Sequence, residues 1–410
     1  MEKSKNGVAN RIAFFVLIMI FYSSGTVYDF RYNQYSDVIR ILLSLFCCFI
    51  FFFSINRYGI NKHWLIRAMF IIISFVVLSL ANGSNLTSIF GVAFRLIGMF
   101  AFTEYCYNTK VNLGELVYKL ILYIAIIFLI MYFLFDVCGI SNDVARVMLS
   151  TSNEKRNVAT SHMTYTVYSN IYYRWQTIRL SFLQRYVPRC NGPFWEPGYY
   201  QIYLNLGLFY ALFINQFKGR HVLLFILAIL STTSTMGMII MFILLGLRVI
   251  KAKYNTVWKA ALLFPLAVAL VVVIFYTIKT IVVMKMYTSS YAVRTTDLYA
   301  WVKNWRPLIG DGLYSKGANM SGLINLVQEY GIIGSFIFYY PLKLCWIISR
   351  KYGKVSALAA LMWFVFSYLN EPLTYHNVTL MLVGACISYH NISDSMNTRW
   401  SYVNYESYSL

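Results

Sequence analysis

The chain has 410 residues, of which 59% are hydrophobic, 18% aromatic and only 12% charged. A water-soluble globular protein carries roughly 25% charged residues. The composition therefore excludes a water-soluble globular protein and indicates a protein that resides in a membrane. The formal net charge is +20.

Apolar runs recur with the length that an α-helix needs to cross about 30 Å of hydrocarbon. The first run follows Lys3, Lys5 and Arg11, and no small-residue cleavage pattern comes after it, which predicts an uncleaved first span. We predict twelve spans, over residues 12–30, 38–55, 64–81, 88–105, 116–138, 195–214, 221–233, 236–249, 258–278, 320–348, 355–370 and 373–390.

The polar break STTST at 231–235 allows either one long helix over 221–249 or two short helices. With two helices, eighteen Lys and Arg of the short connections fall on one side, from Lys3 to Arg399, and only Arg31 and Arg40 fall on the other. The positive-inside rule then places the first side and both termini in the cytoplasm. A single crossing over 221–249 would place every later loop on the opposite side of the membrane, including the basic stretch from Arg248 to Lys259 on the outside. The charge pattern therefore favours two crossings.

Two longer connections depart from this pattern, because both face outward and both are basic. Residues 139–193 carry seven Lys or Arg against two Asp or Glu, and residues 279–318 carry six against two. Long loops tolerate either charge, but an anionic ligand at the outer surface of the membrane also explains the excess. On that interpretation Arg179, Arg185 and Arg294 are candidate ligand-binding residues, and nucleic acid is not an expected partner.

Short amphipathic helices are predicted in both loops. Four apolar residues of the first loop recur at the spacing of one helix face: Ile171, Trp175, Ile178 and Phe182. In the second loop a similar stripe ends at Pro307. The predicted fold is therefore all-α, a single polytopic membrane domain of about twelve helices with two outer loops that carry short amphipathic helices.

Tyrosines crowd the end of the first loop. Most suit an aromatic belt at the membrane boundary, but Tyr199 and Tyr200 are also candidates to pack against sugar rings. Of the seven cysteines, only Cys138 and Cys190 flank the same loop, and a disulfide between them stays open as an alternative.

Neither a P-loop nor an Asp-x-Asp pair occurs in the sequence, so no metal and no cofactor are expected. Arginine can supply the positive charge instead, because its planar guanidinium binds phosphate oxygens in bidentate fashion and stays charged at any relevant pH. A lipid-linked sugar diphosphate at the outer surface would need arginines and a base near the acceptor hydroxyl.

Four features together resemble the bacterial O-antigen polymerases of the Wzy type, within the O-antigen polymerase and ligase group. They are Arg189 and Gly192 with FWEPG at the head of a span, the break STTSTMG, Arg306 followed by Gly317, and the stretch GDGLYSKGANMSGLINLVQEYGIIG with Asn319. The ligases usually have a histidine just before the residue that Asn319 matches. The neighbourhood SKGANM has none, which favours a polymerase over a ligase.

The resemblance implies a glycosyltransferase-C-like fold in the bacterial inner membrane, with the active site facing the periplasm. It implies transfer of a growing glycan from undecaprenyl diphosphate to a lipid-linked oligosaccharide repeat unit. The partners it implies are that lipid-linked substrate, membrane lipid, a flippase and a chain-length regulator. A flippase or exporter is the competing class, but the chain shows no halfway repeat of the kind that transporters often have.

The resemblance and the residue chemistry together give the candidate site. Glu196 is the first choice of general base, His376 the second and Asp29 the third. Arg189 and Arg306 are expected to bind the diphosphate, although an interfacial anchor for Arg189 and a helix-ending role for Arg306 are alternatives. Gly317 and Asn319 are expected to contact the substrate by resemblance.

Arg95 lies inside a predicted span, where an exposed charge costs about 2.5 to 3.5 kcal/mol. We therefore expect it to face either a polar substrate channel or an acidic partner, with Glu104 or Glu371 as that partner.

Overall fold

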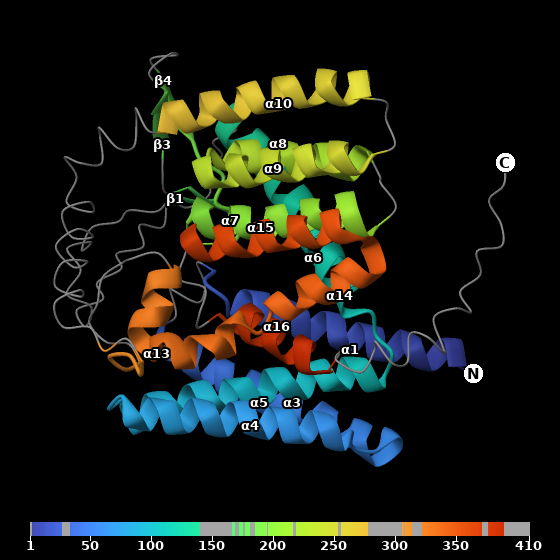
Figure 1. Cartoon of the computed structure of the whole chain (residues 1–410), viewed down its shortest axis with the longest axis vertical. Helices are drawn as coiled ribbons and strands as arrows, with labels where there is room; N and C mark the ends of the chain where they lie inside the picture. The colour runs from blue at the N-terminus through green and yellow to red at the C-terminus, as the bar shows by residue number, and fades with distance from the viewer. Residues whose placement is uncertain are drawn as a thin grey trace.

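The computed structural model describes residues 2–26, 33–139, 166–168, 172–174, 177–180, 185–194, 196–215, 219–252, 256–277, 306, 308–313, 322–370 and 376–388. These residues form a bundle of helices whose axes run side by side across Figure 1, with short strands beside one end of the bundle. The prediction of a mostly helical protein is confirmed.

The helix bounds follow the apolar runs closely. The first half contains α1 (Glu2–Tyr22), α3 (Asn33–Tyr58), α4 (Lys62–Ala81), α5 (Leu86–Asn108) and α6 (Leu113–Tyr132), which continues as the π-helical turn η1 (Phe133–Val137). The second half contains α7 (Pro197–Phe209) with its π-helical turn η2 (Tyr210–Ile214), α8 (Gly219–Thr232), α9 (Thr235–Lys251), α10 (Thr256–Thr277), α13 (Gly322–Tyr339), α14 (Leu342–Tyr352), α15 (Lys354–Asn370) and α16 (Asn377–Ser388).

Local capping explains several of these bounds. The side chains of Asn61, Asn85 and Asn112 accept backbone N–H groups at the starts of α4, α5 and α6. The prediction for the first span was wrong at its end, because α1 stops at Tyr22 and not at residue 30. Ser23 and Ser24 there donate hydrogen bonds back to the Ile20 carbonyl, and Gly25 takes a positive φ of 83°.

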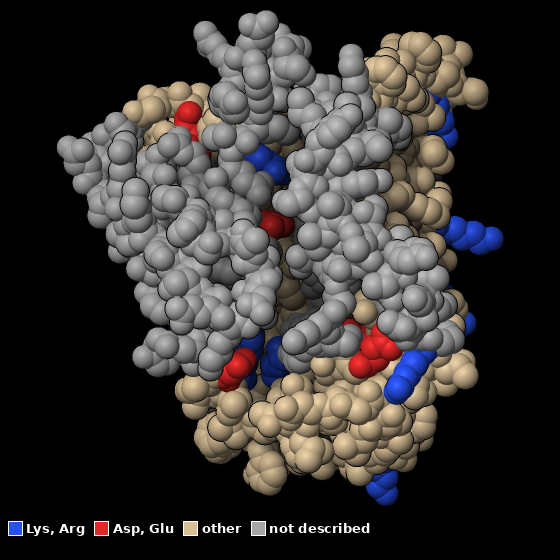
Figure 2. Space-filling view, turned by 90° about the vertical axis from the view of Figure 1, so that its left-hand side faces the viewer, with Lys and Arg blue, Asp and Glu red and all other residues tan. Residues whose placement is uncertain are grey.

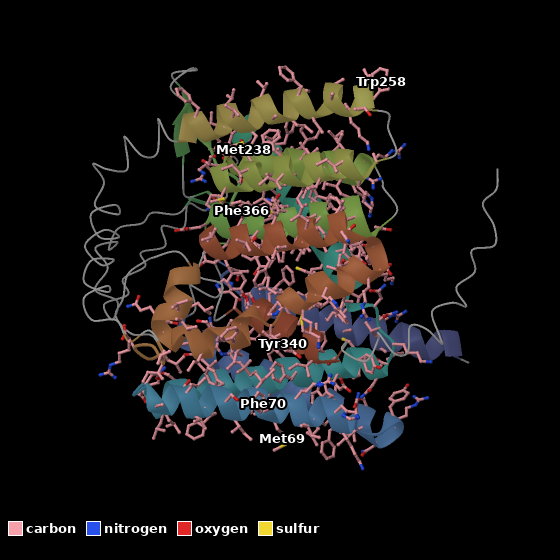
Figure 3. The ribbon with its side chains drawn as sticks, in the orientation of Figure 1. Met69, Phe70, Met238, Trp258, Tyr340 and Phe366 are labelled. Carbon is pink, nitrogen blue, oxygen red and sulfur yellow. The ribbon has the colours of Figure 1, made fainter. Side chains whose placement is uncertain are left out.

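Six described stretches are long and apolar enough to cross a membrane: Asp37–Tyr58, Lys62–Ala81, Leu86–Asn108, Leu113–Val137, Thr256–Val273 and Leu326–Tyr352. Large apolar side chains cover the outside of the bundle, with Phe70 of α4 71% exposed and Phe264 of α10 73% exposed. Figure 3 shows Phe70 at one edge of the bundle and Trp258 at the other. Such a surface is stable in lipid and not in water, so the protein belongs in a membrane.

The break at 231–235 separates two helices, as the charge pattern favoured. Lys251, at the end of α9, lies over the ring of Phe213 in η2, 5.7 Å from its centroid. Because η2 comes just before α8 in the chain, the end of α9 lies at the same end of the bundle as the start of α8. The two helices therefore reverse direction at Thr233, a non-glycine residue with a φ of 47°.

The first long loop, residues 139–193, contains strands where an amphipathic helix was predicted. β1 (Thr166–Tyr168) pairs with β2 (Tyr172–Arg174), and β3 (Thr177–Leu180) pairs with β4 (Arg185–Pro188), both antiparallel. The helical prediction for residues 171–182 was wrong. These segments are rich in Thr, Val, Ile and Tyr, whose preference for strands outweighs the spacing of four apolar residues. The helix predicted in the second loop lies outside the described residues.

The predicted span 320–348 is a broken helix. Gly331 in α13 has a φ of 67° and a ψ of −178°, so the helix axis changes direction there. The segment 308–313 packs into this bend, where Asp311 and Gly312 donate backbone hydrogen bonds to the carbonyls of Gln328 and Glu329. Asn82, at the end of α4, also donates a side-chain hydrogen bond to the Glu329 carbonyl, 3.0 Å away.

Candidate functional site

The segment Arg189 to Glu196 lies across one end of the bundle, which Figure 2 views from outside. Gly192 has a φ of 60° and lies on the ring of Tyr200, where a Cβ atom would approach the ring to 2.7 Å. Phe194 stacks on Tyr203, with ring centroids 4.6 Å apart, and forms a β-bridge with Thr26 after α1. Gly192 and the buried Phe194 ring therefore fix the path of the segment. Charged side chains, both Lys/Arg and Asp/Glu, are visible near the middle of this face in Figure 2.

Arg189 is held by the break between α8 and α9. Its Nε donates a hydrogen bond to the Thr232 carbonyl oxygen at 3.0 Å, and the backbone N–H of Cys190 donates to the Ser231 carbonyl oxygen at 3.0 Å. These are two of the last carbonyls of α8, which lack partners within their own helix. The sequence features RCNG and STTST, 40 residues apart, thus bind each other directly.

A chain of hydrogen bonds continues below this contact. The backbone N–H of Ser234 donates a hydrogen bond to Thr232 Oγ1, and its side-chain Oγ accepts one from the N–H of Gly237. The Gly237 carbonyl accepts a bond from Asn205 Nδ2 of α7 at 3.2 Å. Asn205 is fully buried, so the position of Arg189 is coupled to the interior of the bundle through α7 and α9.

Glu196 precedes α7 as the sequence predicted. It has an extended backbone, its carbonyl accepts the N–H groups of Tyr199 and Tyr200, and Pro197 occupies the first helical position. The side chain is half-buried at the positive N-terminal end of the helix. A negative charge is stabilised there.

His376 lies in the same region, just before α16. Its ring stacks on Tyr199 with centroids 5.0 Å apart and an interplanar angle of 9°. On another side it contacts Gly25, where a Cβ atom would come within 2.7 Å of the imidazole carbon Cε1. The imidazole is therefore fitted between α7 and the turn that ends α1.

Two arginines surround this imidazole electrostatically. Burial, together with the charges of Arg40 and Arg95, lowers the pKa of His376 from its ordinary 6.5 to about 3. His376 is consequently neutral at physiological pH and a weak base, which counts against it as the general base. Arg40 was not among the residues predicted for the site, because it lies more than 330 residues from His376 in the chain.

Arg95 is buried in α5, and its Nε donates a hydrogen bond to the Gly91 carbonyl oxygen. The predicted pairing with Glu104 was wrong, because both residues belong to α5 and lie nine residues, about 13 Å, apart along its axis. Among the described residues, neither carboxylate oxygen of Glu104 forms a hydrogen bond. The charge of Arg95 acts instead on His376, whose pKa it helps to lower.

Tyr199 and Tyr200 are both buried, at 5% and 1% exposure. Tyr200 packs between Gly192, Phe194 and Phe128, so the structure gives it a core position beneath the segment that carries Arg189. Tyr199 supports His376 through the stacked contact.

A groove of about 580 Å³ lies beside Arg189 on the flank of the bundle. It runs between the end of α6 with η1 and the end of α8, and its lining is mostly apolar: Leu129, Ile130, Tyr132, Phe133, Leu134, Leu227, Leu230 and Ser231. Two of these residues bind the neighbours of Arg189. The Tyr132 hydroxyl donates to the Pro188 carbonyl at 3.2 Å, and the Ser231 carbonyl accepts the Cys190 N–H. The residues on either side of Arg189 are therefore bound to the lining of an apolar groove.

Arg306 is exposed, and its backbone carbonyl accepts the N–H of Gly310 at 2.9 Å. Within the described ranges, no hydrogen bond or ion pair connects its guanidinium with the group around Arg189 and His376. Several predicted residues lie outside the description: Asp29, Arg294, Gly317, Asn319 and Glu371. The backbones of Arg179 and Arg185 belong to β3 and β4, and their side chains are not described.

Cys138 and Cys190 do not form a disulfide with each other, so the bridge that the sequence left open is absent. Cys190 is buried, and its thiol faces the Phe128 carbonyl at 3.8 Å. In the part of the chain that the structure describes, no three His, Cys, Asp or Glu side chains lie together as metal ligands.

No family model, no curated protein and no solved structure matches the chain. The functional assignment therefore depends on the residues themselves and on their arrangement.

Proposed function

We propose that the protein is a Wzy-type O-antigen polymerase that crosses the bacterial inner membrane twelve times, with both termini in the cytoplasm and the segment 189–196 at the periplasmic face. Its fold would be of the glycosyltransferase-C kind. Its substrates would be two undecaprenyl-diphosphate-linked glycans, one that donates its growing chain and one repeat unit that accepts it. A flippase and a chain-length regulator would be its partners.

The position of Arg189 supports this proposal most strongly. A lipid diphosphate has an apolar chain and a dianionic or more highly charged head. The groove between α6 and α8 has an apolar lining that includes Ser231, and the next residue, Thr232, holds the Arg189 guanidinium. The hydrogen bond from Nε to Thr232 fixes the plane of the guanidinium, which lowers the entropy that Arg189 would lose on binding phosphate.

The chemistry transfers one glycosyl group. The bond between the anomeric carbon and the diphosphate oxygen of the donor breaks, and the diphosphate leaves with the bonding electron pair. The acceptor hydroxyl oxygen forms the new bond to that carbon and gives its proton to a base. Arginine charge stabilises the negative charge that develops on the departing diphosphate.

Glu196 is the better candidate for that base. Glu196 belongs to the segment that carries Arg189, and it precedes Tyr199 by three residues in the chain. Tyr199 in turn contacts His376. His376 is less suited, because its lowered pKa makes it a weak proton acceptor. Its role in this proposal is to position Tyr199 and the start of α7.

The variant Arg189→Lys tests the proposed contact with the diphosphate. Lysine keeps the charge but cannot both bond Thr232 through Nε and present a planar fork, so we expect polymerisation in reconstituted vesicles to fall at least about tenfold. Arg350→Lys, at the opposite end of the bundle, is the control. Full activity of Arg189→Lys would exclude a bidentate contact and favour a simple interfacial anchor.

A further inference from the structure

A second groove, of about 600 Å³, opens on the flank of the bundle between α1, α3 and α5. It lies at the opposite end from Arg189. Helix α3 passes from Arg40, close to His376, to Arg57 in the groove, which is about 25 Å further along the helix axis. The volume is in the range of pockets that bind small ligands.

The lining of this groove changes from apolar to polar along its length. One part of the lining is mainly apolar and consists of Val8, Ala9, Ile12, Phe49, Ile50, Phe53 and Ser54. The other end, where α3 and α5 terminate, contains Arg57, Tyr58, Tyr105 and Thr109. Phe49 and Arg57 are about 12 Å apart along α3. A complementary ligand therefore has a hydrocarbon chain of that length or more and a polar head at the helix ends.

The charge of the polar end selects an anionic head. Arg57 is exposed, its guanidinium lies 5.4 Å from the centroid of the Tyr58 ring, and no described carboxylate forms an ion pair with it. Among the described residues, no acidic side chain lines the groove. Guanidinium and phosphate form short, bidentate hydrogen bonds, so a phosphate group suits this end.

The groove opens toward the lipid and not toward water. Val8, Phe49 and Phe53 in its lining are 57%, 58% and 62% exposed, and Phe15 of α1 and Phe46 of α3, whose rings contact each other, are exposed as well. A ligand that reaches the groove therefore comes from the bilayer, and phospholipids are its most abundant phosphate-bearing component.

We propose that this groove binds one anionic phospholipid, whose phosphate contacts Arg57 and whose acyl chain lies along Ile12, Phe49 and Phe53. The lipid would fill the space between α1 and α3 and so stabilise the attachment of the first helix. This site does not depend on the glycosyl transfer proposed above, and it takes a different class of ligand at the other end of the molecule.

Photo-crosslinking in lipid nanodiscs with equal amounts of phosphatidylglycerol and phosphatidylcholine tests the proposal. A benzophenone amino acid is placed at Phe53, and the crosslinked lipid is identified by mass spectrometry. We expect phosphatidylglycerol to be enriched about fivefold over its share of the bilayer, as one arginine near the surface contributes about 1 kcal/mol.

Phe70 provides a matched control position. It is 71% exposed on the outer face of α4 (Figure 3), and Arg67 precedes it by three residues, but it lines neither of the two grooves described above. The same label at Phe70 should capture the two lipids in the proportions of the bilayer. Equal enrichment at Phe53 and Phe70 would overturn the proposal, and this comparison needs no change to Arg57.

Substitution of Arg57 then tests the headgroup contact. In the background labelled at Phe53, Arg57→Gln should remove the preference for phosphatidylglycerol, whereas Arg350→Gln should keep it. Arg350 is a fair control, because it also lies at this end of the bundle and its guanidinium is 3.9 Å from the centroid of the Trp346 ring. A preference that survives Arg57→Gln would show that Arg57 does not bind the phosphate.

Discussion

His376 shows at the level of a single residue how the fold changes the chemistry that a sequence suggests. A histidine at the outer ends of the helices is an obvious candidate base, with an ordinary pKa near 6.5. Its burial against Tyr199 and Gly25, with Arg40 and Arg95 nearby, lowers that pKa to about 3. A neutral, tightly packed imidazole is better suited to positioning than to proton transfer.

This change in pKa predicts how stability depends on pH. Between about pH 6.5 and pH 3, the unfolded chain binds a proton at His376 that the folded protein does not bind. Stability is therefore fully present above pH 6.5 and decreases as the pH falls through this window. Thermal unfolding in detergent across pH 4–7 measures it, and His376→Gln should show a weaker pH dependence than the wild type. Identical pH profiles would show that His376 does not contribute.

At the level of the element, the α8–α9 hairpin and the bend of α13 connect distant parts of the chain. The carbonyls at the end of α8 accept hydrogen bonds from residues 189 and 190, and the bend at Gly331 accepts the segment 308–313. Both contacts use helix interruptions, because an intact helix has no carbonyls to offer. Polar breaks within apolar runs therefore create the docking sites for both outer segments.

The bend of α13 should tolerate only glycine at residue 331. Its φ and ψ lie in a region that other residues rarely adopt, and a Cβ atom would collide with the Leu308 carbonyl oxygen. We expect Gly331→Ala to lower the free energy of unfolding by about 1–3 kcal/mol or more, measured by thermal unfolding in detergent.

Gly246 in α9 is the matched control, because the nearest atom to its Cβ position is Leu263 Cδ2 at 3.9 Å. Gly246→Ala should leave stability unchanged or raise it by about 0.5–1 kcal/mol. If the two variants were equally stable, Gly331 would not be the residue that determines the bend.

The sequence predicted the helices well, because each is marked by an apolar run and several by an Asn cap. It failed at Ile171, Trp175, Ile178 and Phe182, whose helical spacing coincides with residues that favour strands. The start of α7 at Pro197 was predictable from local chemistry. The role of Thr232 in holding Arg189 and the approach of Arg40 to His376 were not, because both are contacts between residues far apart in the chain.

At the level of the whole molecule, the two grooves lie toward opposite ends of the bundle. The first adjoins the residues that hold the segment of Arg189, because Ser231 lines it and its other lining residue Tyr132 donates a hydrogen bond to the Pro188 carbonyl. The second has Arg57 in its lining. On our two proposals, the first would take a lipid-linked substrate and the second an anionic phospholipid, each in its own leaflet.

The central claim is that the protein forms glycosidic bonds between lipid-linked glycans. The most direct measurement uses purified protein in vesicles that contain undecaprenyl-diphosphate-linked repeat units, with chain length and released undecaprenyl diphosphate measured over time. If the protein is a polymerase, we expect longer lipid-linked chains and one released undecaprenyl diphosphate for each new glycosidic bond. Movement of repeat units between leaflets without new bonds, or transfer only to a different lipid acceptor, would contradict the account.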